Sequence, residues 1–289
     1  MNKRQLDVLI LSDIHLGTRG SEAKALLNYL RSVEPKLLVL NGDIIDIWQF
    51  STGHFPPAHW AVLREFMDLA EKGVPVYYLT GNHDDTLRKL VPFKMGNLHL
   101  ENRLVLELDD KLAWIFHGDV YDGSITHGRW AARIAGRCYD SIIVFNRFIN
   151  RILKRLKIKP THFSKRLKSG VKRAVSKISN FETKAIDLAI EKGYDYVICG
   201  HIHRPQIREV ITEKGKVIYL NSGDWMENLT SLEYAAGKWD IFTYDENDFL
   251  DSEFKDALKI NLNSLKTSIE NETIQEVFKS HKNFQNAVK

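Results

Sequence analysis

Five short motifs place side chains that commonly ligate metals directly after predicted strands. In chain order they read SDIHLG, NGDIIDIW, GNHD, FHGD and GHIH. Strand ends in α/β proteins converge on one crevice, so we expect these side chains to meet there. The seven candidate ligands are Asp13, His15, Asp43, Asn82, His117, His201 and His203.

This ligand set indicates a site for two metal ions. Carboxylate or amide oxygens combined with imidazoles suit Mn²⁺, Fe or Zn²⁺ better than Ca²⁺, which prefers oxygen ligands alone. Seven ligands exceed the needs of one such ion, but two ions can each take four if one carboxylate bridges them. Two divalent ions ~3.5–4 Å apart activate water and clamp a phosphoryl oxygen. Glycines beside the ligands fit tight turns close to the metals or the substrate. These glycines are Gly42, Gly81, Gly118 and Gly200.

Alternating strands and helices are predicted to position the motifs. Apolar runs at 6–11, 36–40 and 74–79 indicate buried strands. Helical patterns lie between them at 21–33 and 58–72, and Ser21 is the expected N-cap of the first helix. Shorter strands are expected at 98–100, 103–108, 112–116 and 195–199, followed by an antiparallel run at 206–212, 216–220, 231–236 and 238–244. The pattern predicts an α/β fold with mixed sheets.

A strongly basic segment interrupts this pattern. Residues 129–177 hold 15 basic residues and one acidic residue, a net charge of +14, whereas the rest of the chain holds 26 basic and 36 acidic residues, a net charge of −10. Apolar residues recur in this segment at helical spacing, starting at Trp130 and Ile134. We therefore expect a core formed by residues 1–123 and 194–250, an inserted basic helical cap at 124–193, and a polar tail at 251–289.

The composition excludes several classes of protein. No run approaches ~18 consecutive apolar residues, so no transmembrane helix is expected. The start of the chain resembles a strand that leads into a motif and not a signal peptide. Two cysteines, Cys138 and Cys199, cannot form a disulfide framework, and we expect a cytoplasmic protein.

The motifs in this order resemble those of the calcineurin-like metallophosphoesterase superfamily, over about residues 6–245. The resemblance implies a four-layer α/β/β/α sandwich. It also implies one metal bound by Asp13, His15, Asp43 and His203, and a second bound by Asp43, Asn82, His117 and His201. His83 would protonate the leaving oxygen or stabilise transition-state charge, and Asp84 would orient His83. A filled ligand set implies an active phosphohydrolase.

The basic insert, NGDIIDIW and the late NSGDW motif together resemble the UDP-2,3-diacylglucosamine pyrophosphatases of lipid A synthesis. That resemblance implies cleavage of a lipid-linked nucleotide sugar to UMP and 2,3-diacylglucosamine 1-phosphate, with Mn²⁺, at the cytosolic face of the inner membrane. A cap groove with Trp130 and Ile134 would hold acyl chains, and Lys172, Lys177 and Asp119 are further candidates for substrate contact. At the position of His83 the best-known of these enzymes carry arginine, whereas most metallophosphoesterases carry histidine.

Two other functions compete with this interpretation. A nuclease or nucleotide phosphodiesterase of the same superfamily would use the +14 segment to bind phosphates of nucleic acid. A binding scaffold without catalysis would keep the fold alone, which the intact set of Asp13, Asp43, Asn82 and His83 argues against. The sequence leaves the oligomeric state open.

Overall fold

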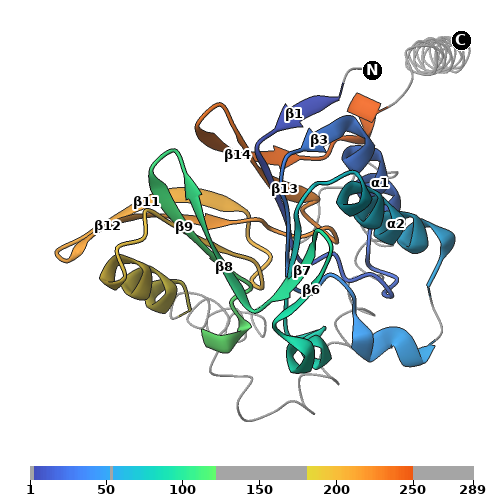
Figure 1. Cartoon of the computed structure of the whole chain (residues 1–289), viewed down its shortest axis with the longest axis horizontal. Helices are drawn as coiled ribbons and strands as arrows, with labels where there is room; N and C mark the ends of the chain where they lie inside the picture. The colour runs from blue at the N-terminus through green and yellow to red at the C-terminus, as the bar shows by residue number, and fades with distance from the viewer. Residues whose placement is uncertain (1–2, 53–54, 122–180, 250–289) are drawn as a thin grey trace, which may run out of the picture. The chain divides into compact units, whose positions relative to one another are not determined.

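The computed structural model describes residues 3–52, 55–121 and 181–249, which form two mixed β-sheets and flanking helices (Figure 1). The chain divides into a unit of Met1–Tyr244, which carries both sheets, and a unit of Asp245–Lys289, of which the structure describes the 3₁₀ helix η5 (Glu246–Phe249). The predicted division into core, cap and tail depends on segments outside these ranges and stays a prediction.

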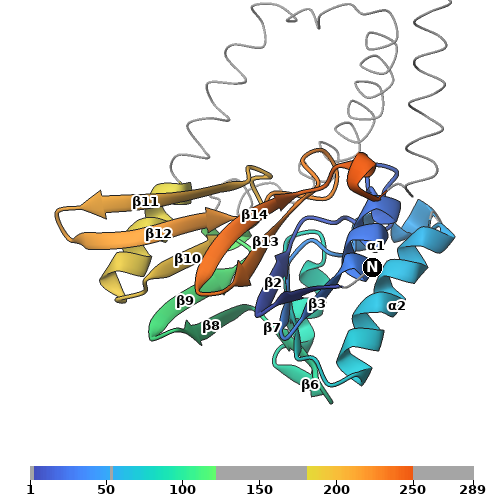
Figure 2. The same ribbon diagram turned by 90° about the horizontal axis from the view of Figure 1, so that it is seen from above.

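The larger sheet has seven strands in the order β14-β13-β2-β4-β5-β7-β6. Its centre is parallel and consists of β2 (Val8–Leu11), β4 (Leu38–Asn41), β5 (Val76–Leu79) and β7 (Leu98–Glu101). The antiparallel strands β13 (Thr230–Ala235) and β14 (Lys238–Thr243) extend one side, and β6 (Phe93–Met95) ends the other. Helices α1 (Ala23–Ser32) and α2 (Pro57–Glu71) lie beside this sheet (Figure 2).

The smaller sheet has five strands in the order β11-β12-β10-β9-β8. β9 (Lys111–Phe116), β10 (Tyr196–Cys199) and β12 (Gly215–Asn221) are parallel, whereas β8 (Arg103–Leu108) and β11 (Gln206–Thr212) are antiparallel to their neighbours. A third, two-stranded sheet pairs β1 (Arg4–Leu6) with β3 (Val33–Pro35). Two further 3₁₀ helices are η1 (Ile47–Thr52) and η2 (Asp85–Leu90), and η3 (Asp119–Tyr121) follows β9.

Alternation along the strands produces two cores. In β9, Ala113 and Ile115 pack against residues of the larger sheet such as Ile10, because successive side chains of a strand point to opposite faces. Trp114 and Phe116 point the other way and pack against the helix over residues 181–191. That helix falls within the predicted cap segment, yet it covers the smaller sheet. The α/β class that the sequence predicts is confirmed.

The structure differs from the predicted boundaries near the first helix. The N-cap residue of α1 is Glu22, not Ser21, and it makes no side-chain capping bond. The helix ends at Ser32, because residues 33–35 pair in parallel with residues 4–6 as strand β3. Tertiary pairing therefore overrides the helical pattern that included Val33. No helix in the described ranges is long and apolar enough to cross a membrane.

Candidate metal centre

The predicted ligand loops follow parallel strands of both sheets. Asp13 lies two residues after β2 and Asp43 two residues after β4, while Asn82 follows β5. His117 comes directly after β9, and His201 lies two residues after β10. The two sheets pack face to face, so the carboxyl ends of their parallel strands lead to one buried cluster.

Distances in this cluster suit shared metal ligands. The His203 Nε2 atom lies 3.1 Å from Asp13 Oδ1, and His117 Nε2 lies 3.4 Å from Asp43 Oδ2. His15 Nε2 lies 3.9 Å from the same Asp43 oxygen. Asp43 is therefore within reach of imidazoles from two different loops, as a bridging ligand requires.

The remaining two candidate ligands border the same cluster. The His201 ring lies 5.3 Å from the His117 ring, and its backbone N–H donates to Asp13 Oδ2 at 3.0 Å. Asn82 precedes His83, whose backbone N–H donates to Asp43 Oδ1 at 2.8 Å. The structure thus places the other five predicted ligands around two of the seven, Asp13 and Asp43.

Buried ligand atoms without hydrogen bonds fit divalent metal ions. Asp13 Oδ1, His15 Nε2, Asn82 Oδ1 and His117 Nε2 are each buried and lack a hydrogen-bond partner among the described residues. A buried polar atom without a partner costs about 1–3 kcal/mol, so such atoms are rare unless something else satisfies them. Imidazole nitrogens together with carboxylate and amide oxygens are suitable ligands for Mn²⁺, Fe or Zn²⁺.

Strained backbone conformations coincide with the predicted ligands. Asp13, His15, Asp43, His201 and His203 all have left-handed backbones, with φ between 49° and 66°. This region is uncommon for residues other than glycine and costs of order 1–3 kcal/mol at each position. Five of the seven predicted ligands therefore adopt backbones that the surrounding fold must hold in place.

Glycines beside the ligands leave room for them. A Cβ atom on Gly42 would collide with the His117 ring, and one on Gly81 would collide with the Asp43 carboxylate. A Cβ on Gly200 would lie 2.6 Å from Asp13 Oδ2. These three loops need glycine because a ligand side chain occupies the space.

We expect Gly81→Ala to lower metal occupancy and hydrolysis together. The added methyl group must displace the Asp43 carboxylate, which is buried and cannot move without disturbing His117. Metal content by mass spectrometry and phosphodiester hydrolysis would check this result. Gly96→Ala is the matched control, because a Cβ there meets nothing within 4 Å, although its φ of +58° adds some backbone strain. Full metal content in Gly81→Ala would contradict the explanation.

Burial and opposite charges set the electrostatics of the cluster. Burial disfavours the charged form of Asp13, but the His203 and His117 imidazoles outweigh it and lower the pKa of Asp13 to about 2. Burial likewise opposes a charged His203, yet the Asp13 carboxylate raises the pKa of His203 to about 9. The pKa of His117 is also raised, because Asp43 and Asp13 outweigh its burial. Without a metal ion, protons on the imidazoles balance the carboxylates.

These pKa directions predict that metal affinity rises with pH. A metal binds neutral imidazole, so below pH 9 an ion must displace the proton on His203, and the raised pKa of His117 means that a proton on that ring must also be displaced. We expect Mn²⁺ affinity to increase between pH 6 and pH 9, by up to about tenfold per pH unit for each proton released. Calorimetric titration in buffers of different protonation enthalpy would count the protons. Affinity that is constant over this range would refute the prediction.

The His83 ring is held by a carboxylate that sequence reasoning missed. His83 Nδ1 lies 2.9 Å from Asp46 Oδ2, and the Asp46 side chain is almost completely buried. Asp46 and Asp43 outweigh burial and raise the pKa of His83 to about 9. The Trp48 ring packs 4.3 Å from the His83 ring. The available signal was the second aspartate of NGDIID, three residues after Asp43.

Asp84 has a different set of contacts from the one that the resemblance implied. It accepts hydrogen bonds from the Tyr78 hydroxyl at 2.6 Å and from the backbone N–H groups of Gly81 and Ile44. None of the hydrogen bonds that the structure describes for Asp84 involves the His83 ring. Asp84 therefore joins the loop that carries Asn82 to the loop that carries Asp43. Burial and the nearby Asp43 charge raise the pKa of Asp84 to about 6.

Two other aspartates support the ligand loops. Asp224, of the NSGDW motif, accepts hydrogen bonds from the backbone N–H groups of Met226 and Glu227. The backbone N–H of Trp225 donates to the Asp13 carbonyl at 3.1 Å. Asp119 accepts a hydrogen bond from Arg88 at 2.6 Å. The predicted substrate contact of Asp119 is untested, and its visible role is to join the loops after β5 and β9.

We expect Arg88→Gln to weaken metal binding without abolishing it. Arg88 also donates to the Thr80 carbonyl and hydroxyl, so it connects the residues before Asn82 with the turn after His117. A part-buried charged bond is worth about 1.5–3 kcal/mol, which predicts a loss of stability of that order in chemical denaturation. Arg103→Gln, at an exposed position at the start of β8, serves as the control. Equal losses of metal affinity and stability in the two variants would contradict the role given to Arg88.

The remaining predicted substrate contacts fall outside the described residues. They are Trp130, Ile134, Lys172 and Lys177.

The known proteins that this chain resembles are phosphohydrolases, in agreement with a metal centre. The family model for calcineurin-like phosphoesterases matches residues 6–205. A UDP-2,3-diacylglucosamine hydrolase of Aliivibrio fischeri is 27% identical over 240 residues, which are 80% of this chain and 95% of that protein. The enzyme of the same name from Stenotrophomonas maltophilia is 25% identical, over 82% and 98%.

Solved phosphoesterases give lower similarity. The phosphoesterase Yfce from E. coli is 12% identical over 82% of this chain and 99% of that one, with a TM-score of 0.40. The family model covers more than half of the chain and includes all seven candidate ligands. The chain therefore belongs to the calcineurin-like phosphoesterases, a family of metal-dependent phosphohydrolases.

Proposed function

We propose that this protein hydrolyses the pyrophosphate of UDP-2,3-diacylglucosamine to give UMP and 2,3-diacylglucosamine 1-phosphate. The observation that carries its phosphohydrolase chemistry is the cluster of buried ligand atoms without hydrogen bonds around Asp13 and Asp43. The choice of substrate is supported by relatives of 23–27% identity that carry the name UDP-2,3-diacylglucosamine hydrolase.

Two divalent ions would fit the seven ligands, with Mn²⁺ the preferred ion and Fe or Zn²⁺ as alternatives. One site would use Asp13, His15, Asp43 and His203, and the other Asp43, Asn82, His117 and His201. When bound, the ions supply Lewis acidity and lower the pKa of water. The chain contributes the ligand loops, in which glycines leave room for the ligand side chains and the fold holds five of the ligands in left-handed backbones.

His83 is the proposed general acid. Asp46 holds its Nδ1 atom, which leaves Nε2 as the ring nitrogen for the leaving oxygen of the substrate. The carboxylate also favours the protonated ring, which can donate a proton or stabilise negative charge on the phosphoryl oxygens. Asp84 is a positioning residue, because it accepts hydrogen bonds from the Gly81 and Ile44 backbones beside the ligands.

The substrate would reach this centre beneath the basic insert. A lipid with two phosphates and two acyl chains suits cations near the metals and an apolar groove above them. The sequence of residues 129–177 offers both, because basic and apolar residues alternate along it. The same segment would bind an anionic membrane surface at about 1 kcal/mol per cation. We place the enzyme in the cytoplasm, bound peripherally to the inner membrane.

An assay with two substrates tests this proposal. The protein loaded with Mn²⁺ is expected to release UMP from UDP-2,3-diacylglucosamine in mixed micelles far faster than p-nitrophenol from bis-p-nitrophenyl phosphate. Activity on the second substrate alone would contradict the proposed lipid substrate but would still support a phosphohydrolase. Cleavage of DNA with a steep salt dependence would instead favour a nuclease, which the +14 segment of residues 129–177 also suits.

A further inference from the structure

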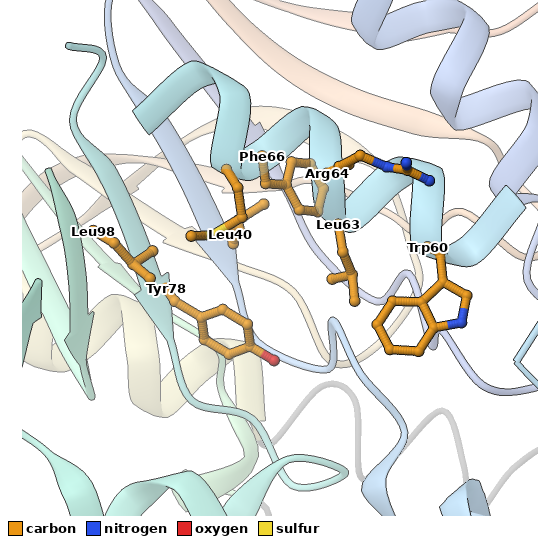
Figure 3. Close-up of a pocket in the computed structure, with 8 residues that line it drawn as sticks. Leu40, Trp60, Leu63, Arg64, Phe66, Tyr78 and Leu98 are labelled. Atoms are coloured by element: carbon orange, nitrogen blue, oxygen red, sulfur yellow. The ribbon is translucent and has the colours of Figure 1, made fainter. Parts of the chain in front are cut away.

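An apolar cavity of about 530 Å³ lies between α2 and the larger sheet, and none of the seven candidate ligands lines it (Figure 3). Leu40, Tyr78 and Leu98 line it from the strands, and Trp60 and Leu63 line it from the helix. Its volume falls in the range of about 300–1,000 Å³ that is typical of small-molecule sites.

The cavity lies at the border between the core side of α2, from which Phe66 lines it, and a second apolar stripe of the same helix. The core side of α2 consists of His59, Val62, Phe66 and Leu69, which are buried. Trp60, Leu63 and Met67 form a second apolar stripe at helical spacing, and Trp60 and Met67 are 55% and 46% exposed. Exposed large apolar side chains that border a cavity are a feature of ligand or interaction sites.

The apolar surface continues onto the edge of the sheet. In the antiparallel pair β6–β7, Met95 lies opposite Leu98 and Phe93 lies opposite Leu100. Residues directly opposite each other share one face of a sheet, so Met95 is on the same face as Leu98, which lines the cavity. Met95 is 53% exposed and Phe93 is 47% exposed. A ligand longer than the cavity would therefore find a further apolar surface here.

The polar groups at the cavity identify the chemistry of the ligand. The Tyr78 hydroxyl already donates to Asp84 at 2.6 Å, so it is not available as a donor to a ligand. Arg64 is the one charged side chain among the described residues that line the cavity. It forms no ion pair with any residue that the structure describes. Its neighbour Glu65 instead approaches Arg31 at 3.9 Å. The lining that the structure describes thus combines an apolar interior with one cation, Arg64, that has no ion pair among the described residues.

We propose that this cavity binds a single-chain anionic amphiphile of the fatty-acid class, with the aliphatic chain along Trp60, Leu63 and Met67 and the carboxylate at Arg64. A peptide or protein segment would bring backbone polar groups into an interior that offers them no partner. An aliphatic chain brings none, and its anionic end complements Arg64, the one cation of the described lining. This site is independent of the proposed substrate.

Binding of laurate to the full-length, Mn²⁺-loaded protein tests the proposal. We expect saturable binding of one laurate, which is lost in Leu63→Trp because the larger side chain fills the cavity. Arg64→Glu should weaken laurate by about threefold to tenfold, and should leave the affinity for neutral dodecanol unchanged. Lys72→Glu, the same charge reversal at an exposed position that does not line the cavity, is the control.

The variants also define the results that would overturn the proposal. Laurate binding that survives in a folded Leu63→Trp protein would place the chain elsewhere, and equal losses in Arg64→Glu and Lys72→Glu would remove the role of Arg64. Thermal unfolding verifies that each variant folds. If Leu63→Trp does not fold, Met67→Glu at the exposed border of the cavity replaces it, with the same expected loss.

Discussion

Asp43→Asn is expected to lose both metal ions and to lower hydrolysis by more than about 10³-fold. Asp43 lies 3.4 Å from His117 and 3.9 Å from His15, so its carboxylate is the one shared by both predicted ion sites. The amide keeps the shape and the hydrogen bond from the His83 N–H, but it removes the negative charge that two cations would share. Metal content per chain and hydrolysis of bis-p-nitrophenyl phosphate give the result.

A surface aspartate supplies the matched control for this substitution. Asp7→Asn changes the same group in the chain just before β2, where Asp7 pairs with the exposed Lys36 at 2.7 Å. Exposed pairs of this kind are screened by solvent and contribute little, so metal content and turnover should not change. An Asp43→Asn protein that retains two ions would show that another side chain bridges the sites.

His83→Ala is expected to lower turnover by about 10²–10⁴-fold while the metal content persists. The ring contacts Asp46 through Nδ1 and lies beside the ligand His15, but it is not one of the seven predicted ligands. A general acid is needed for the leaving oxygen and not for the ions. Metal analysis and turnover on one protein sample separate the two roles.

A substitution of Asp46, which contacts the His83 ring, makes this test more specific. Asp46→Asn should lower turnover and reduce the proton affinity of His83, so the pH above which activity falls should move down. Adding Asp46→Asn to His83→Ala should cost little more, because Asp46 would act through the ring. Loss of metal in His83→Ala, or additive effects in the double variant, would demote His83 to a structural role.

The ligand positions were predictable because their signal is local. Each motif combines a strand of apolar residues with ligand side chains at its carboxyl end, and parallel strands bring such ends together whatever the details of the sheet. Gly42, Gly81 and Gly200 were predictable for a related reason, since a glycine beside a ligand indicates a close approach of backbone to a side chain.

Other features depend on contacts that the local pattern does not contain. The role of Asp46 requires that the turn after β4 point this side chain at a ring from the loop after β5. The left-handed backbone of His15, His201 and His203 is uncommon for residues other than glycine, and no local sequence pattern predicts it. Strand β3 replaces the end of a predicted helix because it pairs with β1, a partner about 30 residues earlier.

The central claim is that the strand-end cluster is a two-ion catalytic centre. Anomalous diffraction from crystals loaded with Mn²⁺ tests it most directly, since each ion gives its own peak. We expect two peaks ~3.5–4 Å apart, with Asp43 between them, Asp13, His15 and His203 around one, and Asn82, His117 and His201 around the other. A single peak, or none at these residues, in a protein that hydrolyses phosphodiesters would contradict the account.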